Sequence, residues 1–205
     1  TPIERVEFAL KKFGRLSDSE IVTPAFVADK VVQLLPIDAM DNDATVLDIA
    51  SKQGEFACAL YKYFGEDKRN NIYALPTSSL TYEFTYKVFQ LLDIPTGNIF
   101  STFNSYDLIG DNNEQYIQIL ENMKFNAIVG NPPYQMRVDI KDTDNGQKRV
   151  SSIFHLFQQV SDQISRYTSM IYPGGRWIHQ FGKGMKQFGI SQINNCNMSK
   201  LIYYP

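Results

Sequence analysis

Residues 46–56 have the sequence VLDIASKQGEF, which joins an apolar run to a glycine-containing loop and then to an amphipathic stretch. The apolar run predicts a buried strand over 45–49, and the amphipathic stretch predicts a helix over 55–64. A turn of this kind brings the backbone N–H groups at the start of a helix close to an anionic or carboxylate-bearing ligand. By itself the pattern also fits an ordinary strand-to-helix connection.

The alternation of short apolar runs and amphipathic stretches continues along the chain. Further strands are expected over 71–75, 98–102, 125–129, 168–172 and 200–204, and further helices over 80–92, 114–123 and 152–166. Two helices are expected before the first strand, one over 3–13 and one in which Thr23 is the N-cap and Pro24 the first helical residue. The alternation predicts a doubly wound α/β fold with a mainly parallel sheet, whose ligands bind at the carboxyl ends of the strands.

Composition narrows the class of protein. The chain has 205 residues, 43% hydrophobic and 20% charged, which favours one globular domain. Its formal net charge of -2 offers no general attraction to nucleic acid, so a nucleic-acid site has to be local. Cys58 and Cys196 lack metal-type spacing and suit free thiols in a reducing cytoplasm. We therefore expect no metal site. The sequence contains no apolar run of about 18 residues, so we expect no membrane partner.

Residues 125–134, with the sequence FNAIVGNPPY, predict a second site at the end of a buried strand. The two prolines fix the backbone and remove donors, so the loop presents carbonyl acceptors, and Asn131 adds its amide oxygen. Two acceptors that hold the hydrogens of a planar amino group favour its nucleophilic geometry and stabilise the positive charge that develops on nitrogen. Tyr134 adds a face for an extruded base. The alternative is a simple loop breaker.

In their order, these segments resemble the amino-methyltransferases that modify adenine N6 in DNA, especially the large modification methylases of restriction systems. The resemblance runs from about Leu16 to the end of the chain. It implies a Rossmann-like methyltransferase fold, S-adenosylmethionine as cofactor and double-stranded DNA as substrate. It also implies that Asn131, Pro132, Pro133 and Tyr134 are catalytic, and that a restriction or specificity module is a partner in the same chain or complex.

The resemblance also implies a set of cofactor-binding residues. The Thr-Pro start of an N-terminal motif approaches the methionine part of the cofactor, a glycine loop follows the first strand, and an acidic residue lies near the adenine amino group. In this sequence the matching positions are Thr23, Pro24, Phe26, Val27, Asp48, Ala50, Lys52, Gly54, Phe56 and Asp107.

Two positions depart from the family pattern. Lys52 stands where the family has glycine, and two interpretations stay open: its ammonium pairs with the cofactor carboxylate, or its side chain crowds the cofactor. After the second expected strand the family has an acidic residue for the ribose hydroxyls, whereas this chain offers only Thr77 and Ser78. Weak cofactor binding is therefore expected.

Two other functions remain as alternatives. An Asn-Pro-Pro-Tyr site also suits glutamine-N5 methylation of a protein, and the departures at Lys52 and after the second strand suit a non-catalytic methyltransferase-like binding domain. The Thr-Pro helix and the long segment 135–149 favour the DNA enzyme. We expect 1–36 to hold the N-terminal helices and 37–205 the catalytic core, together one globular unit. We also expect a sheet incomplete at the C-terminus, with an exposed edge at 201–204 that favours association. The target-recognition domain is expected to be absent, and the 205 residues alone should have little or no methyltransferase activity.

Overall fold

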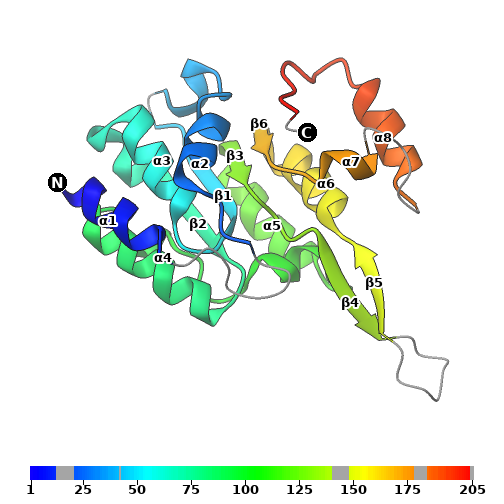
Figure 1. Ribbon diagram of the computed structural model, residues 1–205, viewed down its shortest axis with the longest axis horizontal. Coiled ribbons are helices and arrows are strands. Elements are labelled where there is room, and N and C mark those ends of the chain that lie inside the picture. The colour runs from blue at the N-terminus through cyan, green and yellow to red at the C-terminus, as the bar shows by residue number, and fades with distance from the viewer. Residues whose placement is uncertain (13–20, 42, 140–147, 178–183, 204–205) are drawn as a thin grey trace. The chain divides into compact units, whose positions relative to one another are not determined.

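The computed structural model describes residues 1–12, 21–41, 43–139, 148–177 and 184–203. The chain divides into two compact units, Thr1–Ile171 and Tyr172–Pro205. The second unit contains the helices α7 (Gly174–Trp177) and α8 (Lys186–Ile193). The four-stranded sheet and the candidate site belong to the first unit (Figure 1).

Four parallel strands form the central sheet in the order β2-β1-β3-β6. They are β1 (Val46–Ser51), β2 (Ile72–Pro76), β3 (Phe125–Gly130) and β6 (Ser165–Met170). The chain runs from β1 to β2 on one side and then returns to place β3 on the other side of β1. The order therefore reverses between β1 and β3, where ligands bind in sheets of this kind. The predicted Rossmann-like fold is confirmed.

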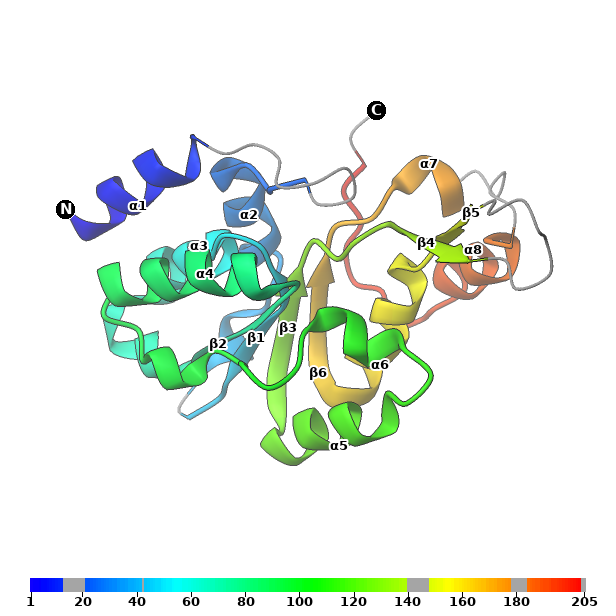
Figure 2. The ribbon, with the colours of Figure 1, turned by 90° about the horizontal axis from the view of Figure 1, so that it is seen from below.

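Helices cover both faces of this sheet (Figures 1 and 2). The helices of the first unit are α1 (Pro2–Leu10), α2 (Ala25–Val32), α3 (Glu55–Phe64), α4 (Ser79–Leu91), α5 (Glu114–Met123) and α6 (Phe154–Ile164). Val46 and Val129 pack with α1 to α4, whereas Leu47 and Ile128 pack with α5 and α6. Neighbouring residues of a strand face opposite sides of the sheet, so the apolar strands contribute side chains to two cores. The unit therefore has three layers: helices, sheet and helices.

Short 3-10 helices complete the connections: η1 (Ile37–Met40), η2 (Glu66–Asn71), η3 (Thr96–Asn98) and η4 (Ser105–Ile109). The expected strand over 98–102 is wrong, because this segment makes a single parallel bridge from Ile99 to Ala74. Its apolar character comes from packing: Ile99 and Phe103 are buried, and the rings of Phe100 and Phe103 lie 5.2 Å apart. Asn131 therefore follows the third strand rather than a fourth.

The expected strand over 200–204 is also wrong where it is described. Residues 200–203 have no regular secondary structure, and Leu201, Ile202 and Tyr203 are about half exposed. No described strand pairs with them, so they form no sheet edge, and the association expected from such an edge loses its basis. Residue 204 lies outside the described part of the chain.

A β-hairpin follows the Asn-Pro-Pro-Tyr segment directly. Its antiparallel strands are β4 (Gln135–Asp139) and β5 (Lys148–Ser152), and Figure 1 shows it extending away from the four-stranded sheet. The Ile153 N–H donates to the Tyr134 carbonyl at 3.1 Å, which closes the hairpin at its base. No strand was expected over 135–149, and this polar segment lacks the apolar run typical of a buried strand.

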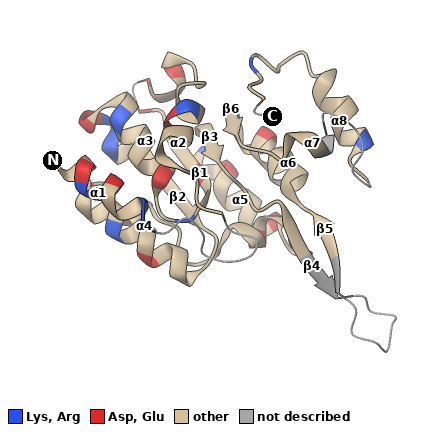
Figure 3. Ribbon diagram, viewed as in Figure 1, with Lys and Arg blue, Asp and Glu red and all other residues tan. Residues whose placement is uncertain are grey.

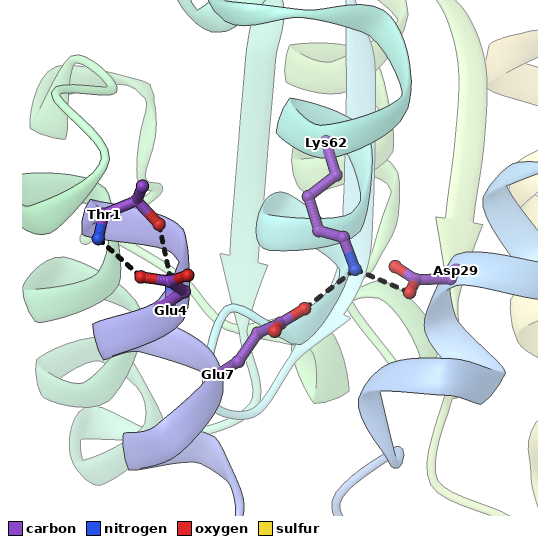
Figure 4. A network of polar contacts seen from close by, with 5 residues as sticks. All are labelled: Thr1, Glu4, Glu7, Asp29 and Lys62. Carbon is purple, nitrogen blue, oxygen red and sulfur yellow. Dashed lines mark hydrogen bonds and ion pairs between the residues drawn. The ribbon is translucent and has the colours of Figure 1, made fainter.

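Charged residues of both signs lie next to one another on the helices of the first unit (Figure 3). Lys62 on α3 shows how they connect elements: its Nζ lies 2.8 Å from Glu7 Oε1 on α1 and 2.7 Å from Asp29 Oδ2 on α2. At the start of α1, the Thr1 hydroxyl accepts a hydrogen bond from the Glu4 N–H (Figure 4). The Lys62 contacts join three helices on one face of the sheet.

Candidate functional site

Asn131 lies at the carboxyl end of β3, beside the reversal in strand order, and is 7% exposed. Its side-chain Nδ2 donates to the Thr23 hydroxyl at 3.2 Å. Its Oδ1 is buried and has no hydrogen-bond partner among the described residues. A buried acceptor without a partner costs free energy, so this oxygen is an open acceptor that a ligand donor would satisfy. The buried Pro132 and Pro133 follow it and bring no N–H groups.

The expectation that Thr23 is the N-cap of α2 is wrong. Pro24 is the N-cap and Ala25 the first helical residue, and no side chain caps the helix. The Thr23 hydroxyl instead accepts from Asn131, and its N–H donates to Glu55 Oε1 at 3.2 Å. A long-range contact has therefore replaced the local one.

The remaining residues of the N-terminal motif lie outside this hydrogen-bonded group. Pro24 is exposed, Val27 is half-buried, and Phe26 is 64% exposed on α2. The structure thus brings Thr23 to Asn131 and leaves Phe26 at the surface of the first unit.

Asp48 on β1 is fully buried next to the end of β3. Its Oδ1 accepts from the Ala50 N–H at 3.3 Å, and its Oδ2 has no partner in the described part of the chain. Burial, reinforced by the nearby Glu55 carboxylate, raises the pKa of Asp48 from 3.8 to about 8. A Cβ at Gly130 would lie 3.2 Å from Ile49 Cγ2, which is a tight contact, and 3.6 Å from Asp48 Oδ1, which is an ordinary one, so this glycine leaves room for Ile49.

The loop after β1 contains a buried lysine. Lys52 is 2% exposed, and its Nζ donates to the Asn131 carbonyl and to the Ile21 carbonyl, each at 2.8 Å. Gly54 has a φ of +78°, and a Cβ there would lie 3.0 Å from Val88 Cβ on α4. This position therefore needs glycine for its backbone and for its packing. Phe56 is buried in the apolar core beside α2 and α4.

Glu55 belongs to the site although the sequence did not suggest it. It is 2% exposed at the start of α3, and it accepts from the Thr23 N–H at 3.2 Å and the Gln53 N–H at 2.9 Å. The helix dipole favours an acidic residue in the first turn, so the position of Glu55 at the start of a helix can be recognised from a local signal in the sequence. The contact with Thr23, 32 residues upstream, has no such signal. We use the name polar cluster for Thr23, Lys52, Glu55 and Asn131.

Asp107 lies on η4 at the same edge of the sheet. It is half-buried, and its Oδ2 accepts from the Asn104 N–H at 2.8 Å. The neighbouring Ser105 hydroxyl lies 2.8 Å from the carbonyl oxygen of Ile49, with the carbonyls of Leu75 and Pro76 at 3.1 and 3.2 Å. Ser105 thereby holds η4 over the carboxyl ends of β1 and β2, which explains how a residue far along the chain reaches the site.

The segment after β2 was expected to offer hydroxyls in place of an acid. Thr77 is 3% exposed, its N–H donates to the Ser51 carbonyl at 3.2 Å, and its hydroxyl donates to Thr81. Ser78 caps α4 through the Thr81 N–H. Both hydroxyls therefore already take part in the start of α4.

Tyr134 is half-buried where β4 begins. Its ring lies 6.5 Å from that of Phe154 at 78°, an edge-to-face contact. Burial raises the pKa of Tyr134 to about 12, so its hydroxyl is neutral at physiological pH. The aromatic ring of Tyr134 is thus held beside α6 and is not part of the polar cluster.

The family profile described as Eco57I restriction-modification methylase matches residues 70–205. The chain belongs to this family. The matched range contains Asn131 to Tyr134 and begins after Lys52. No match was found among curated proteins. None of the described helices has the length and hydropathy to cross a membrane, and in the same residues no group of three His, Cys, Asp or Glu is placed to hold a metal ion.

Two solved structures show the same fold. The type I restriction-modification system methyltransferase subunit from Streptococcus thermophilus matches with a TM-score of 0.60 and 17% identity over 83% of this chain. This chain spans 39% of that subunit. The O-methyltransferase from Bacillus cereus, in complex with SAH, matches with a TM-score of 0.54 and 13% identity over 93% of this chain and 76% of its own.

Proposed function

We propose that the protein transfers a methyl group from S-adenosylmethionine to the N6 amino group of adenine in DNA, as the modification part of a restriction-modification system. The observation that carries this proposal is the buried Oδ1 of Asn131, which lacks a partner among the described residues at the carboxyl end of β3. Membership of the Eco57I restriction-modification methylase family supports DNA as the substrate.

Asn131 and Pro132 hold the amino group in this proposal. The bond from Asn131 Nδ2 to Thr23 turns Oδ1 toward the substrate, where it accepts one amino hydrogen. The Pro132 carbonyl accepts the other, since a proline brings no competing donor. Both acceptors stabilise the positive charge that grows on nitrogen as the new bond forms. Tyr134 stacks on the adenine after it has left the duplex.

The residues around β1 fit the cofactor. S-adenosylmethionine, when bound, supplies an electrophilic methyl group next to a positive sulfur. The buried Oδ2 of Asp48 has no partner among the described residues, and a bound cationic group would favour the ionised form of this acid. Asp48 lies beside Gly130, just before Asn131. Asp48 and the backbone of residues 52–54 would hold the amino-acid end of the cofactor, and Asp107 would approach its adenine. The hydroxyls of Thr77 and Ser78 already serve α4, which agrees with weak ribose binding.

The charge distribution indicates how this chain meets DNA. Lys and Arg residues of the described helices alternate with Asp and Glu and do not gather over one element (Figure 3). Proteins that bind DNA mainly through phosphates present a basic face. We therefore expect the described helices to make few phosphate contacts, and the extruded nucleotide to be the main DNA contact of the described residues.

Methylation of plasmid DNA by the full-length protein tests the proposal. Mass spectrometry of the nucleosides should detect N6-methyladenine. N4-methylcytosine as the sole product in DNA, or methylglutamine in a protein as the sole product, would contradict the proposal. Asn131→Ala should lower the single-turnover rate by about 100-fold to 1,000-fold, the loss seen for one oxyanion-hole donor, and leave cofactor affinity unchanged. The surface variant Asn122→Ala is the control and should react like the wild type.

A further inference from the structure

Lys52 is a charged side chain that the fold keeps inside the first unit. It is 2% exposed, and its ammonium donates to two backbone carbonyls, those of Ile21 and Asn131. Ile21 precedes α2 by a few residues, and Asn131 follows β3. The Lys52 side chain therefore connects the loop after β1, residues 52–54, to two segments that are far away in sequence. We call residues 52–54 the cofactor loop.

Neutral carbonyl oxygens do not balance the charge of a buried ammonium, which is costly to desolvate. Glu55 and Lys52 both act on the carboxyl group of Asp48: burial and Glu55 raise its pKa to about 8, and Lys52 favours its ionised form. Both Glu55 oxygens already accept from backbone N–H groups. Lys52 donates hydrogen bonds to the carbonyls of Ile21 and Asn131, and these two bonds link the loop after β1 to both segments.

Asn131 is consequently fixed at two points. Its Nδ2 bonds to Thr23, which sets the rotation of the amide, and its carbonyl bonds to Lys52, which sets the backbone. Ile21, the second acceptor of Lys52, lies two residues from Thr23 in the same segment. One ammonium therefore acts on Asn131 directly and on the segment that orients its amide.

We propose that Lys52 is a positioning residue for methyl transfer, whose ammonium holds the Asn131 loop against the cofactor loop so that Asn131 Oδ1 meets the amino group in the reactive geometry. This inference rests on the proposed function. It differs from both interpretations that the sequence left open, pairing with the cofactor carboxylate and crowding of the cofactor.

Lys52→Met in the full-length protein separates the three roles. Lys52→Met keeps most of the volume and removes the charge. A positioning role predicts a rate of methyl transfer about 100-fold lower, as for a small misplacement of a reacting group. It also predicts nearly unchanged dissociation constants for S-adenosylhomocysteine and for 5′-methylthioadenosine, which lacks the amino-acid part. Weaker binding of S-adenosylhomocysteine alone would show carboxylate pairing, and tighter binding of both would show crowding; either result overturns the proposal.

Hydrogen exchange of the protein without ligands gives a readout that does not depend on activity. Lys52→Met should increase amide exchange in peptides that cover 21–23 and 125–135 and leave peptides of α5 unchanged. Unchanged exchange in the first two regions, or an equal increase everywhere, would overturn the proposal. Lys62→Met, which removes ion pairs with Glu7 and Asp29, is the matched control and should destabilise the fold without slowing methyl transfer.

Lys52→Arg keeps the charge and the donors with a larger head group. It should recover part of the rate lost in Lys52→Met, and it serves as the test variant if Lys52→Met does not fold. A rate no better than that of a folded Lys52→Met, or a loss of S-adenosylhomocysteine affinity in step with the rate, would overturn the proposal.

The same assays show which idea fails. A wild-type protein that methylates no DNA, or an Asn131→Ala variant that keeps the wild-type rate, counts against the proposed function. A wild type that methylates DNA, with Asn131→Ala slow and Lys52→Met fast, counts against the role of Lys52 alone.

Discussion

The side-chain amide of Asn131 donates a hydrogen bond of 3.2 Å to the hydroxyl of Thr23, a residue 108 positions earlier in the chain. This contact directs the amide nitrogen toward Thr23 and leaves the oxygen as the open acceptor. The orientation of the proposed catalytic amide therefore depends on a segment that lies outside the sheet.

Thr23→Val should slow methyl transfer while preserving the fold. Valine has nearly the same shape but offers no acceptor, so the amide of Asn131 loses the bond that orients it. The loss of one hydrogen bond is worth about 1 kcal/mol, which corresponds to roughly fivefold in rate. Single-turnover measurements on DNA check this, with Thr23→Ser as the control that keeps the hydroxyl. Equal rates for Thr23→Val and the wild type would show that the contact does not orient Asn131.

Tyr134→Ala should weaken productive DNA binding more than it affects the cofactor. Stacking on an aromatic ring contributes about 1–3 kcal/mol per base, so the KM for DNA should rise by roughly 5-fold to 150-fold. Tyr134→Phe should behave like the wild type between about pH 6 and 9, because the tyrosine hydroxyl, with its pKa raised to about 12, does not ionise there. A Tyr134→Phe variant as impaired as Tyr134→Ala would move the role from the ring to the hydroxyl.

Asp48→Asn should change how stability depends on pH. The pKa of Asp48 is raised from 3.8 to about 8, mainly by burial and next by Glu55. Between these values the folded protein binds a proton that the unfolded chain releases. Stability should therefore decrease as the pH rises from about 4 to 8, and the asparagine variant should lack this part of the decrease.

Urea unfolding of wild type and Asp48→Asn at several pH values measures the effect. The variant should gain free energy of unfolding relative to the wild type as the pH increases. Parallel curves for the two proteins would contradict a raised pKa at Asp48.

Gly54→Ala should destabilise the fold markedly. The left-handed backbone costs a residue with a Cβ about 1–2 kcal/mol, and the Cβ would lie 3.0 Å from Val88 Cβ, so overpacking adds about 1–3 kcal/mol. Gly97→Ala is the control, because a Cβ there meets no atom within 4 Å and should change stability by less than about 0.5 kcal/mol. Similar unfolding free energies for the two variants would refute the argument from backbone and packing.

Strong local patterns predicted much of the fold. The buried strands β1, β2 and β3 and the helices α3 and α5 were expected close to their observed bounds, because apolar runs and 3.6-residue periodicity identify buried strands and amphipathic helices. The same criterion failed over 98–102, whose apolar side chains are buried without a ladder of strand hydrogen bonds. It also missed the polar hairpin of β4 and β5, which has no buried apolar run to reveal it.

The site was predictable in its parts and not in its connections. The sequence pointed to Asn131 and Lys52 separately, through a strand end and a departure from the family pattern. Their hydrogen bond, and the bonds of Glu55 and Thr23, join segments that only the folded sheet brings together. Long-range side-chain contacts leave no periodicity in a single sequence, so they had to come from the structure.

The hairpin that follows Tyr134 has a consequence for how this protein can evolve. Its two strands begin and end at adjacent points beside α6, where the Ile153 N–H bonds to the Tyr134 carbonyl. Residues added or removed beyond this closure need not move Asn131 or α6. The hairpin is therefore a place where natural variants can differ in length, and where a designer can insert a new segment, while the chemistry next to it is preserved.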